Sequence, residues 1–249
     1  MLIDTHCHVL SSEYDNVNEI IEDAFSNGVN KLIINGFDVD SSKEALRLAE
    51  AYENVYAAVG IGPENIDLSD DAIRTIEKLS ENDKVVAIGE IGLDYYWTTD
   101  NKNDQIKLFI KMLEIAKHRN LPVIVHSRKA SEDTYNYLKE YNVKGILHCY
   151  SGSTEMAKRF IDLGFLLGIG GVITFKNAKE LKEVVNTYEV DNFALETDSP
   201  YLSPEPFRGQ KNMPRNVRLV AEKIAEIKDL KYEEILDKTG HSVTQLFDL

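Results

Sequence analysis

Short apolar segments recur along the 249-residue chain and alternate with longer segments in which apolar residues repeat at helical spacing. Val, Ile, Leu and Ala dominate the short segments, which is typical of strands buried on both faces. We expect strands at residues 2–6, 31–36, 55–61, 85–90, 122–126, 145–148, 165–169 and 193–197. Strands that alternate with helices in this way indicate parallel βα units.

The intervening segments carry the periodicity and end signals of amphipathic helices. The first apolar stripe stops at Asn27-Gly28 and comprises Val17, Ile20, Ile21, Ala24 and Phe25. Ser41 and Glu44 predict a capping box at the start of the next helix. A final helix is expected to follow Tyr232.

No feature of the chain divides it into separate domains. It has no Pro/Ser-rich linker, no low-complexity tract and no internal repeat of 20 to 50 residues. We therefore predict a single (β/α)8 TIM barrel that spans residues 1–249, a usual length for this fold. A doubly wound parallel sheet remains the alternative.

Composition indicates a globular protein, with 43% hydrophobic and 28% charged residues. The first ten residues lack the pattern of a secretion signal, and no apolar run has the roughly 20 residues of a membrane span. We expect a cytoplasmic location, no membrane association and no obligate protein partner. Cys7 and Cys149 are expected to be reduced, packed thiols.

The formal net charge of −14 argues against a broad nucleic-acid-binding surface. Duplex binding usually depends on a basic face that displaces counterions from the phosphates. A local phosphate site remains compatible with this charge, which also favours solubility.

Histidines and carboxylates gather at the predicted strand ends. His6 and His8 lie two residues apart, so their side chains point the same way if the segment is extended. Later strand ends carry four further residues of this kind: Glu90, His126, His148 and Asp198. Catalytic groups of TIM barrels lie at the carboxyl ends of the strands. Separate hydrogen-bonded core histidines would explain any one of these residues, but not the whole set.

These six residues predict a centre with two divalent metal ions. Imidazole and carboxylate groups suit Zn²⁺, Mn²⁺, Fe²⁺, Co²⁺ or Mg²⁺. Six ligands exceed the four of a tetrahedral zinc site, so we expect two ions bridged by Glu90 with open positions for water. Asp4 either orients an imidazole or is a turn carboxylate. His118, in a polar helix end, and His241, near the start of the final helix, are left out of the site.

Five motifs give the chain a close resemblance to the TatD-related deoxyribonuclease family, within the amidohydrolase-like metal-dependent hydrolases. The resemblance covers nearly the whole chain. Its motifs are Asp4-Thr5-His6-Cys7-His8, Gly89-Glu90-Ile91-Gly92-Leu93-Asp94-Tyr95, Pro122-Val123-Ile124-Val125-His126-Ser127-Arg128, His148-Cys149-Tyr150-Ser151-Gly152 and Glu196-Thr197-Asp198-Ser199-Pro200-Tyr201-Leu202.

The resemblance implies the distribution of ligands and the activity. One metal would be surrounded by His6, His8, Glu90 and Asp198, and the other by Glu90, His126 and His148, with hydrolysis of DNA as the reaction. Two positions differ from the family pattern. Gly62 stands where the family often has a histidine that can contact phosphate, and Gln210 stands at a commonly basic position.

The expected mechanism uses a metal-activated water to attack a phosphodiester. Asp198 is the candidate base, either accepting a proton from the water or acting only as a ligand, and Glu90 is the candidate bridge. Candidate phosphate contacts, or alternatively ordinary surface cations, are Arg128, Arg208 and Lys211. Aromatic residues that either stack on a base or anchor a loop are Tyr95, Tyr96 and Trp97.

Two further functions remain open. The same centre would suit a small amide, lactone or phosphoester, because activated water attacks carbonyl and phosphoryl centres alike. A non-catalytic metal-dependent binding protein is the alternative from another class. The sequence leaves open the metal, the strandedness and polarity of DNA cleavage, the pathway and the oligomeric state.

Overall fold

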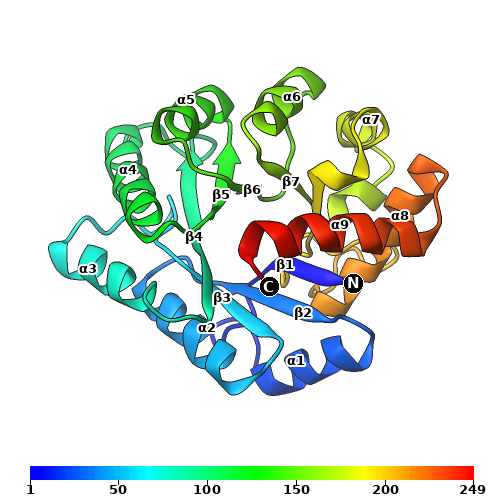
Figure 1. Ribbon diagram of the computed structural model, residues 1–249, viewed down its shortest axis with the longest axis horizontal. Coiled ribbons are helices and arrows are strands. Elements are labelled where there is room, and N and C mark those ends of the chain that lie inside the picture. The colour runs from blue at the N-terminus through cyan, green and yellow to red at the C-terminus, as the bar shows by residue number, and fades with distance from the viewer.

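Eight parallel strands, hydrogen-bonded in chain order, form the centre of the computed structural model, which describes all residues 1–249 (Figure 1). Their bounds are β1 Ile3–Cys7, β2 Lys31–Asn35, β3 Val55–Val59, β4 Val85–Asp94, β5 Val123–Arg128, β6 Gly145–Leu147, β7 Leu166–Ile169 and β8 Phe193–Leu195. A bridge between Cys7 and Ser199 nearly closes the ring. The predicted (β/α)8 barrel is confirmed, since a doubly wound sheet would not keep the strands in chain order.

Helices surround the barrel; α1 to α7 connect successive strands, and α8 and α9 follow β8. They are α1 Val17–Ser26, α2 Val39–Ala51, α3 Asp70–Leu79, α4 Lys102–Arg119, α5 Ser131–Tyr141, α6 Thr154–Asp162, α7 Lys179–Thr187, α8 Val217–Lys228 and α9 Tyr232–Phe247. The predicted stop of α1 and the start of the last helix are confirmed. Apolar faces of these helices pack on the outer side of the strands, which places the larger part of the core between the two layers.

The predicted capping box of α2 is wrong by one turn. Asp38 is the N-cap, and its side chain accepts a hydrogen bond of 2.8 Å from the backbone N–H of Ser41. The hydroxyl of Ser41 accepts in return from the backbone N–H of Asp38. Glu44 instead accepts two hydrogen bonds from Ser11. The carboxylate of Asp38, and not the hydroxyl of Ser41 as predicted, therefore caps the free N–H groups at the start of the helix.

Most strands end within two residues of their predicted bounds, and β4 and β8 differ from them for local reasons. Strand β4 continues four residues past Glu90, because its pairing with β5 shifts between Ile88 and Ile91 and then resumes as far as Asp94. Strand β8 ends at Leu195 rather than residue 197. There the backbone N–H of Thr197 bonds to the carboxylate of Asp4 in place of a neighbouring strand.

Helix α9 crosses one end of the barrel (Figure 1). Its residues Val243 and Phe247 join a separate cluster of ten buried residues, most of which come from the strands. The first residue of the chain lies against Gly240 of the same helix, so this end is the amino end of the strands. His241 lies past the middle of α9, not near its start as predicted. The opposite end, at the carboxyl ends of the strands, is not covered by α9, and the predicted histidines and carboxylates lie there.

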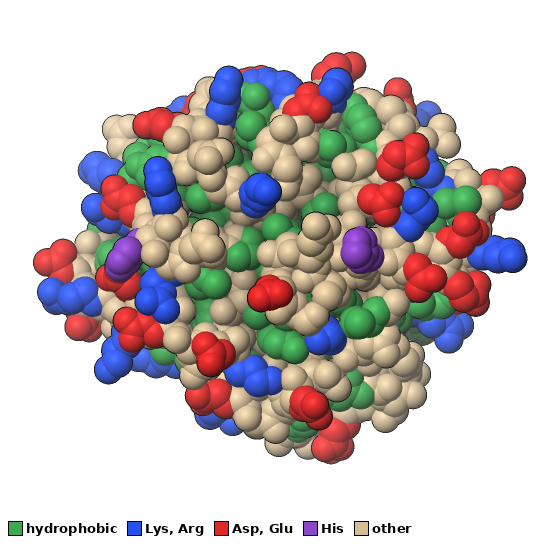
Figure 2. Space-filling view, in the orientation of Figure 1, with side chains coloured by type: hydrophobic (Ala, Val, Ile, Leu, Met, Phe, Trp, Pro, Cys, Tyr) green, Lys and Arg blue, Asp and Glu red, His purple; other side chains and the backbone are tan.

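The face seen in Figure 2, in the orientation of Figure 1, mixes acidic and basic side chains and shows no extended basic patch. Such interspersed charges are usual on the surface of globular proteins. No helix of the chain combines the length and the apolarity needed to cross a membrane.

Candidate metal centre

Six polar side chains converge at the carboxyl ends of the strands. His6 is fully buried, whereas the side chains of Glu90, Asp198 and His126 are 13%, 14% and 21% exposed. Three overlapping groups of these residues have ligand atoms within 4.8 Å of one another. The structure thus brings together all the residues predicted as metal ligands: His6, His8, Glu90, His126, His148 and Asp198.

Glu90 lies at the centre of this set and faces two pairs of histidines. Its Oε2 atom lies 3.5 Å from Nε2 of His6 and 3.4 Å from Nε2 of His8. Its Oε1 atom lies 3.1 Å from Nδ1 of His126 and 3.4 Å from Nε2 of His148. Oδ1 of Asp198 lies 3.7 and 3.6 Å from the first pair. One carboxylate therefore presents a separate oxygen to each half of the cluster.

The outer nitrogens of three histidines face acceptors. Nδ1 of His8 lies 2.9 Å from the carbonyl oxygen of Asn35. Nε2 of His126 lies 2.9 Å from Oδ2 of Asp94, and Nδ1 of His148 lies 3.5 Å from Oε1 of Glu196. A hydrogen on each outer nitrogen leaves the inner nitrogen free to donate a lone pair, which is the usual arrangement around metal-ligating histidines.

The inner side of the cluster fits divalent cations. Nε2 of His6 and Nε2 of His8 lie only 3.1 Å apart in a buried position. Because the carbonyl oxygen of Asn35 can only accept, Nδ1 of His8 carries a hydrogen, and the neutral form of this ring points a lone pair at the ring of His6. Buried lone pairs and carboxylates that face one another need a shared proton or a cation. The donor set of imidazoles and carboxylates is suited to divalent metal ions.

Charges and hydrogen bonds within this cluster shift the pKa values of its members. Burial works to raise the pKa of Glu90, but the charge of His148 and hydrogen bonds from the histidines hold it well below its usual value. Burial works to lower the pKa of His126, yet its bonds to Asp94 and Glu90 raise it to about 9. The pKa of Asp198 is also lowered, against burial, by His8 and the charge of His148. These carboxylates therefore stay ionised at neutral pH.

A bulge in β4 directs Glu90 into the mouth of the barrel. The pairing shift between Ile88 and Ile91 encloses Glu90, and bulges of this kind re-aim side chains. Gly92 follows with φ of +143°, and a Cβ there would lie 1.9 Å from the carbonyl oxygen of His126. Only glycine allows β4 to pass so close to β5. The bulge and the glycine together place Glu90 beside His126.

The segment after β8 is held by buried side chains. Asp4 accepts hydrogen bonds from the backbone N–H and the hydroxyl of Thr197, at 2.9 and 2.6 Å. It bonds to no imidazole side chain, so the predicted role of orienting a histidine is not what the structure shows. Asn212 donates to the carbonyl oxygens of Thr197 and Tyr201, at 2.9 and 2.8 Å. These contacts support Asp198, whose φ of 55° lies in the left-handed region.

Three supporting residues were not assigned from the sequence. Asp94 and Glu196 lie within motifs that carry the family resemblance, and their position beside a histidine-bearing strand was the available signal. Asn212 lies in the loop 14 residues after Asp198, and no motif in the sequence indicates its contacts.

A cleft of about 720 Å³ opens over the cluster. Arg128 is the only lysine or arginine among the residues that line it. Arg208 lies outside, with its guanidinium 4.4 Å from the ring centre of Phe175. Lys211 is also outside the lining and donates a hydrogen bond to the carbonyl oxygen of Glu13. Arg128 is thus the predicted phosphate contact that the cleft geometry favours.

The three aromatic residues after β4 have different environments. The hydroxyl of Tyr95 donates to Asp133 at 3.0 Å, and the ring packs against the core, so Tyr95 anchors the loop. Tyr96 is 51% exposed and Trp97 is 69% exposed. Trp97 also lines the cleft. The two cysteines are free thiols; Cys7 is buried, and Cys149 lies at the wall of the cleft.

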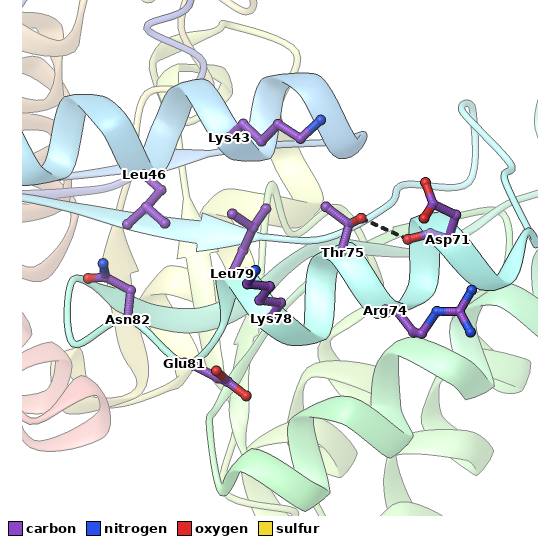
Figure 3. A pocket seen from close by; sticks show the side chains of 9 residues that line it. All are labelled: Lys43, Leu46, Asp71, Arg74, Thr75, Lys78, Leu79, Glu81 and Asn82. Carbon is purple, nitrogen blue, oxygen red and sulfur yellow. Dashed lines mark hydrogen bonds between the residues drawn. The ribbon is translucent and has the colours of Figure 1, made fainter.

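A second hollow of about 710 Å³ lies on the outside of the barrel between α2 and α3 (Figure 3). Cations and carboxylates alternate along it, including Lys43, Asp71, Arg74, Lys78 and Glu81. It contains no histidine or cysteine. The mouth of the barrel is therefore the stronger candidate for a catalytic site.

Comparisons with known proteins agree on one kind of enzyme. A family model described as TatD related DNase matches residues 3–248. An uncharacterized metal-dependent hydrolase of Bacillus subtilis is 43% identical over 252 residues, covering 99% of each chain. A second uncharacterized metal-dependent hydrolase, from Escherichia coli K12, is 34% identical, covering 100% of this chain and 96% of the relative. The crystal structure of YjjV, a TatD homologue of the same bacterium, has a TM-score of 0.92 and 32% identity, covering 100% of this chain and 98% of that one.

Proposed function

The chain belongs to the TatD-related DNase family of metal-dependent hydrolases, and on that premise we propose that it cleaves DNA phosphodiester bonds with two divalent cations. The observation that carries the proposal is the position of Glu90, whose two oxygens each face a different pair of histidines. A carboxylate that offers one oxygen to each of two ligand sets is suited to bridge two cations. When bound, such cations polarise a phosphoryl oxygen and make water acidic enough to attack at neutral pH.

The residues of the chain divide into two ligand groups and a base. His6, His8 and Asp198 would hold one cation, His126 and His148 the other, with Glu90 shared between them. Asp198 is 14% exposed and lines the cleft, and its lowered pKa keeps it ionised. An ionised carboxylate at this position accepts a proton from the attacking water and holds that water toward the phosphorus.

Supporting side chains keep this geometry before substrate arrives. Oδ2 of Asp94 is within hydrogen-bond distance of the outer nitrogen of His126, at 2.9 Å, and Oε1 of Glu196 lies 3.5 Å from the outer nitrogen of His148. The carboxylates favour the hydrogen on the outer nitrogen, so the inner nitrogen keeps its lone pair. Arg128 would hold a phosphate oxygen at the rim, since a planar guanidinium binds phosphate with two parallel hydrogen bonds. Little reorganisation is then required when a phosphodiester binds.

A substrate panel with controlled metal content tests the proposal. The panel contains single-stranded and duplex DNA, RNA, a simple phosphodiester and a small lactone. Each is assayed after chelation and after addition of Mg²⁺, Mn²⁺ or Zn²⁺, with metal content measured in parallel. We expect DNA cleavage that disappears on chelation and returns with a metal, at a stoichiometry near two. Activity on the lactone alone would overturn the proposal.

A small phosphoester, amide or lactone is the second candidate substrate. Two features of the cleft favour it: Arg128 is its only lysine or arginine, and Glu64 adds a carboxylate to the lining. A long polyanion gains little from such a surface away from the metals. Full metal occupancy without turnover of any substrate would instead indicate a metal-dependent binding protein.

A further inference from the structure

Trp97 is largely exposed at the wall of the cleft. It is the only tryptophan of the chain and, at 69%, the most exposed of its large hydrophobic residues. Its ring lies edge-on to that of Tyr96 with 5.0 Å between the ring centres. Tryptophans are usually mostly buried. An exposed indole at the wall of the cleft is therefore available to a ligand.

Arg128 lies beside these rings and is also unpaired. Its guanidinium carbon is 3.7 Å from the ring centre of Tyr96 and 5.2 Å from that of Trp97. No carboxylate lies within salt-bridge distance of it, although the chain has 42 acidic residues. Stacking on the rings leaves the edge of the guanidinium free for hydrogen bonds. An anion in the cleft can use that edge.

The position of Arg128 relative to the metal centre is fixed by β5. Residues His126 and Arg128 are two apart on this strand, so they share a side at a separation of about 6.6 Å along it. Both line the cleft. Arg128 is thus placed to bind a phosphate next to the one that is cleaved, not the reacting group itself.

The loop that carries Trp97 is tied to the same centre. The backbone N–H of Tyr96 donates to Oδ1 of Asp94 at 2.8 Å, and Oδ2 of Asp94 faces His126 at 2.9 Å. The hydroxyl of Tyr95 donates a hydrogen bond to Asp133, which holds the start of the same loop. A ligand surface that is held in place before binding costs less conformational entropy than one that forms on binding.

We propose that Trp97 and Arg128 form a nucleotide platform, in which Trp97 stacks on an unpaired nucleobase and Arg128 binds that nucleotide's phosphate. The inference deepens the proposed nuclease function and rests on it. An exposed aromatic ring accepts any base, because every base has a flat face. The same face is covered by neighbouring bases in a duplex. The platform therefore selects a nucleotide that has left the stack.

The first test uses the fluorescence of Trp97, which reports on this position alone because no other tryptophan is present. The metal-loaded protein is titrated with a four-nucleotide phosphorothioate oligothymidylate, whose linkage resists cleavage. The control ligand is an abasic phosphorothioate of equal length and charge. We expect quenching by the thymidylate and affinity about 5- to 150-fold higher than for the abasic chain, the range of one base–aromatic stack. Equal affinity for the two would overturn the platform.

Single substitutions separate the contributions of Trp97 and Arg128 to binding. We expect Trp97→Ala to weaken thymidylate binding by about 5- to 150-fold and leave abasic binding unchanged, while Trp97→Phe retains most of the affinity. Arg128→Ala should weaken both ligands alike, since both contain the phosphate. Matched controls are Phe207→Ala, an exposed ring outside the cleft lining, and Arg159→Ala, a guanidinium 4.0 Å from Tyr135 on the outer helices. Binding is measured by anisotropy of dye-labelled oligomers.

Two outcomes distinguish failure of the platform from failure of the nuclease proposal. Ordinary phosphodiester versions of both oligomers are incubated with the metal-loaded enzyme. Cleavage of both at the same kcat/KM leaves the nuclease function standing and overturns the platform. Cleavage of neither overturns the nuclease function itself. Preferred cleavage of the thymidylate, lost in Trp97→Ala, supports both.

Discussion

Replacement of Gly62 by histidine tests whether the cleft binds a phosphate at the end of β3. Gly62 lines the cleft, and its φ lies outside the left-handed region. A Cβ there would lie 3.6 Å from the carbonyl oxygen of Phe37, 3.7 Å from that of Glu90 and 3.8 Å from Cβ of Phe37. These are ordinary contacts. Pro63 favours extended backbone at position 62, which histidine adopts readily. Backbone geometry therefore does not require a glycine at position 62.

The expected gain follows from one new charged hydrogen bond. Such a bond contributes about 1 to 3 kcal/mol when it forms in the transition state, or about 5- to 150-fold in kcat/KM for DNA. The gain should grow below neutral pH, because the imidazolium pairs best with phosphate. It should shrink again where protons displace the metals from their ligands.

The assay compares kcat/KM of Gly62→His for DNA and for a small uncharged ester. Gly62→Phe is the matched control, since it adds a ring of similar size without a hydrogen-bond donor. We expect the gain only for DNA and only with histidine. A gain confined to the uncharged ester would refute the phosphate contact and favour the small-molecule hydrolase. Equal losses on both substrates would show that the space beside Phe37 is needed by every substrate.

Three further predictions concern the metal centre. Glu90→Ala should abolish turnover and lower occupancy at both positions, because the cations lose the anion that offsets their repulsion; two fully occupied metals would contradict the bridge. Asp198→Asn should keep most of its metal and lose about 10²- to 10⁴-fold in rate, since an amide oxygen coordinates but accepts no proton; a near-normal rate would remove Asp198 from the mechanism. Metal affinity should rise from pH 6 towards pH 9, by about tenfold per pH unit for each proton that the metal displaces. It should level off above the pKa of His126, which is about 9 in the cation-free protein. Titration calorimetry that shows no such pH dependence would contradict the presence of protonated imidazoles in the cation-free site.

The sequence was sufficient to predict the barrel and the cluster of histidines and carboxylates at its mouth, because both depend on local patterns. Buried parallel strands are continuous apolar runs, and the polar residues that follow them are conspicuous by contrast. Since all strands of a barrel point the same way, His6 and His148 had to meet although 142 residues separate them. No knowledge of distances was needed for that conclusion.

The supporting contacts could not be predicted because they depend on where loops cross. Asp4 was expected either to orient an imidazole or to be a turn carboxylate, yet it bonds to Thr197, which is 193 residues away in the chain. Arg208 and Lys211 looked equivalent to Arg128 as cations, but only Arg128 continues a strand into the cleft. The bulge at Glu90 likewise results from the pairing of β4 with β5, and the sequence of β4 alone does not determine it.

Closure of one end of the barrel by α9 determines how substrate can travel. Inward side chains of the strands fill the barrel, and Val243 and Phe247 pack against them at the closed end, so no passage runs through the molecule from end to end. A nucleic acid chain cannot thread through this protein as it threads through a ring. Under the proposed nuclease function, such a chain would lie across the mouth, and both fragments would leave from the side on which the substrate arrived. Each round of cleavage would then be followed either by release or by sideways movement over the rim.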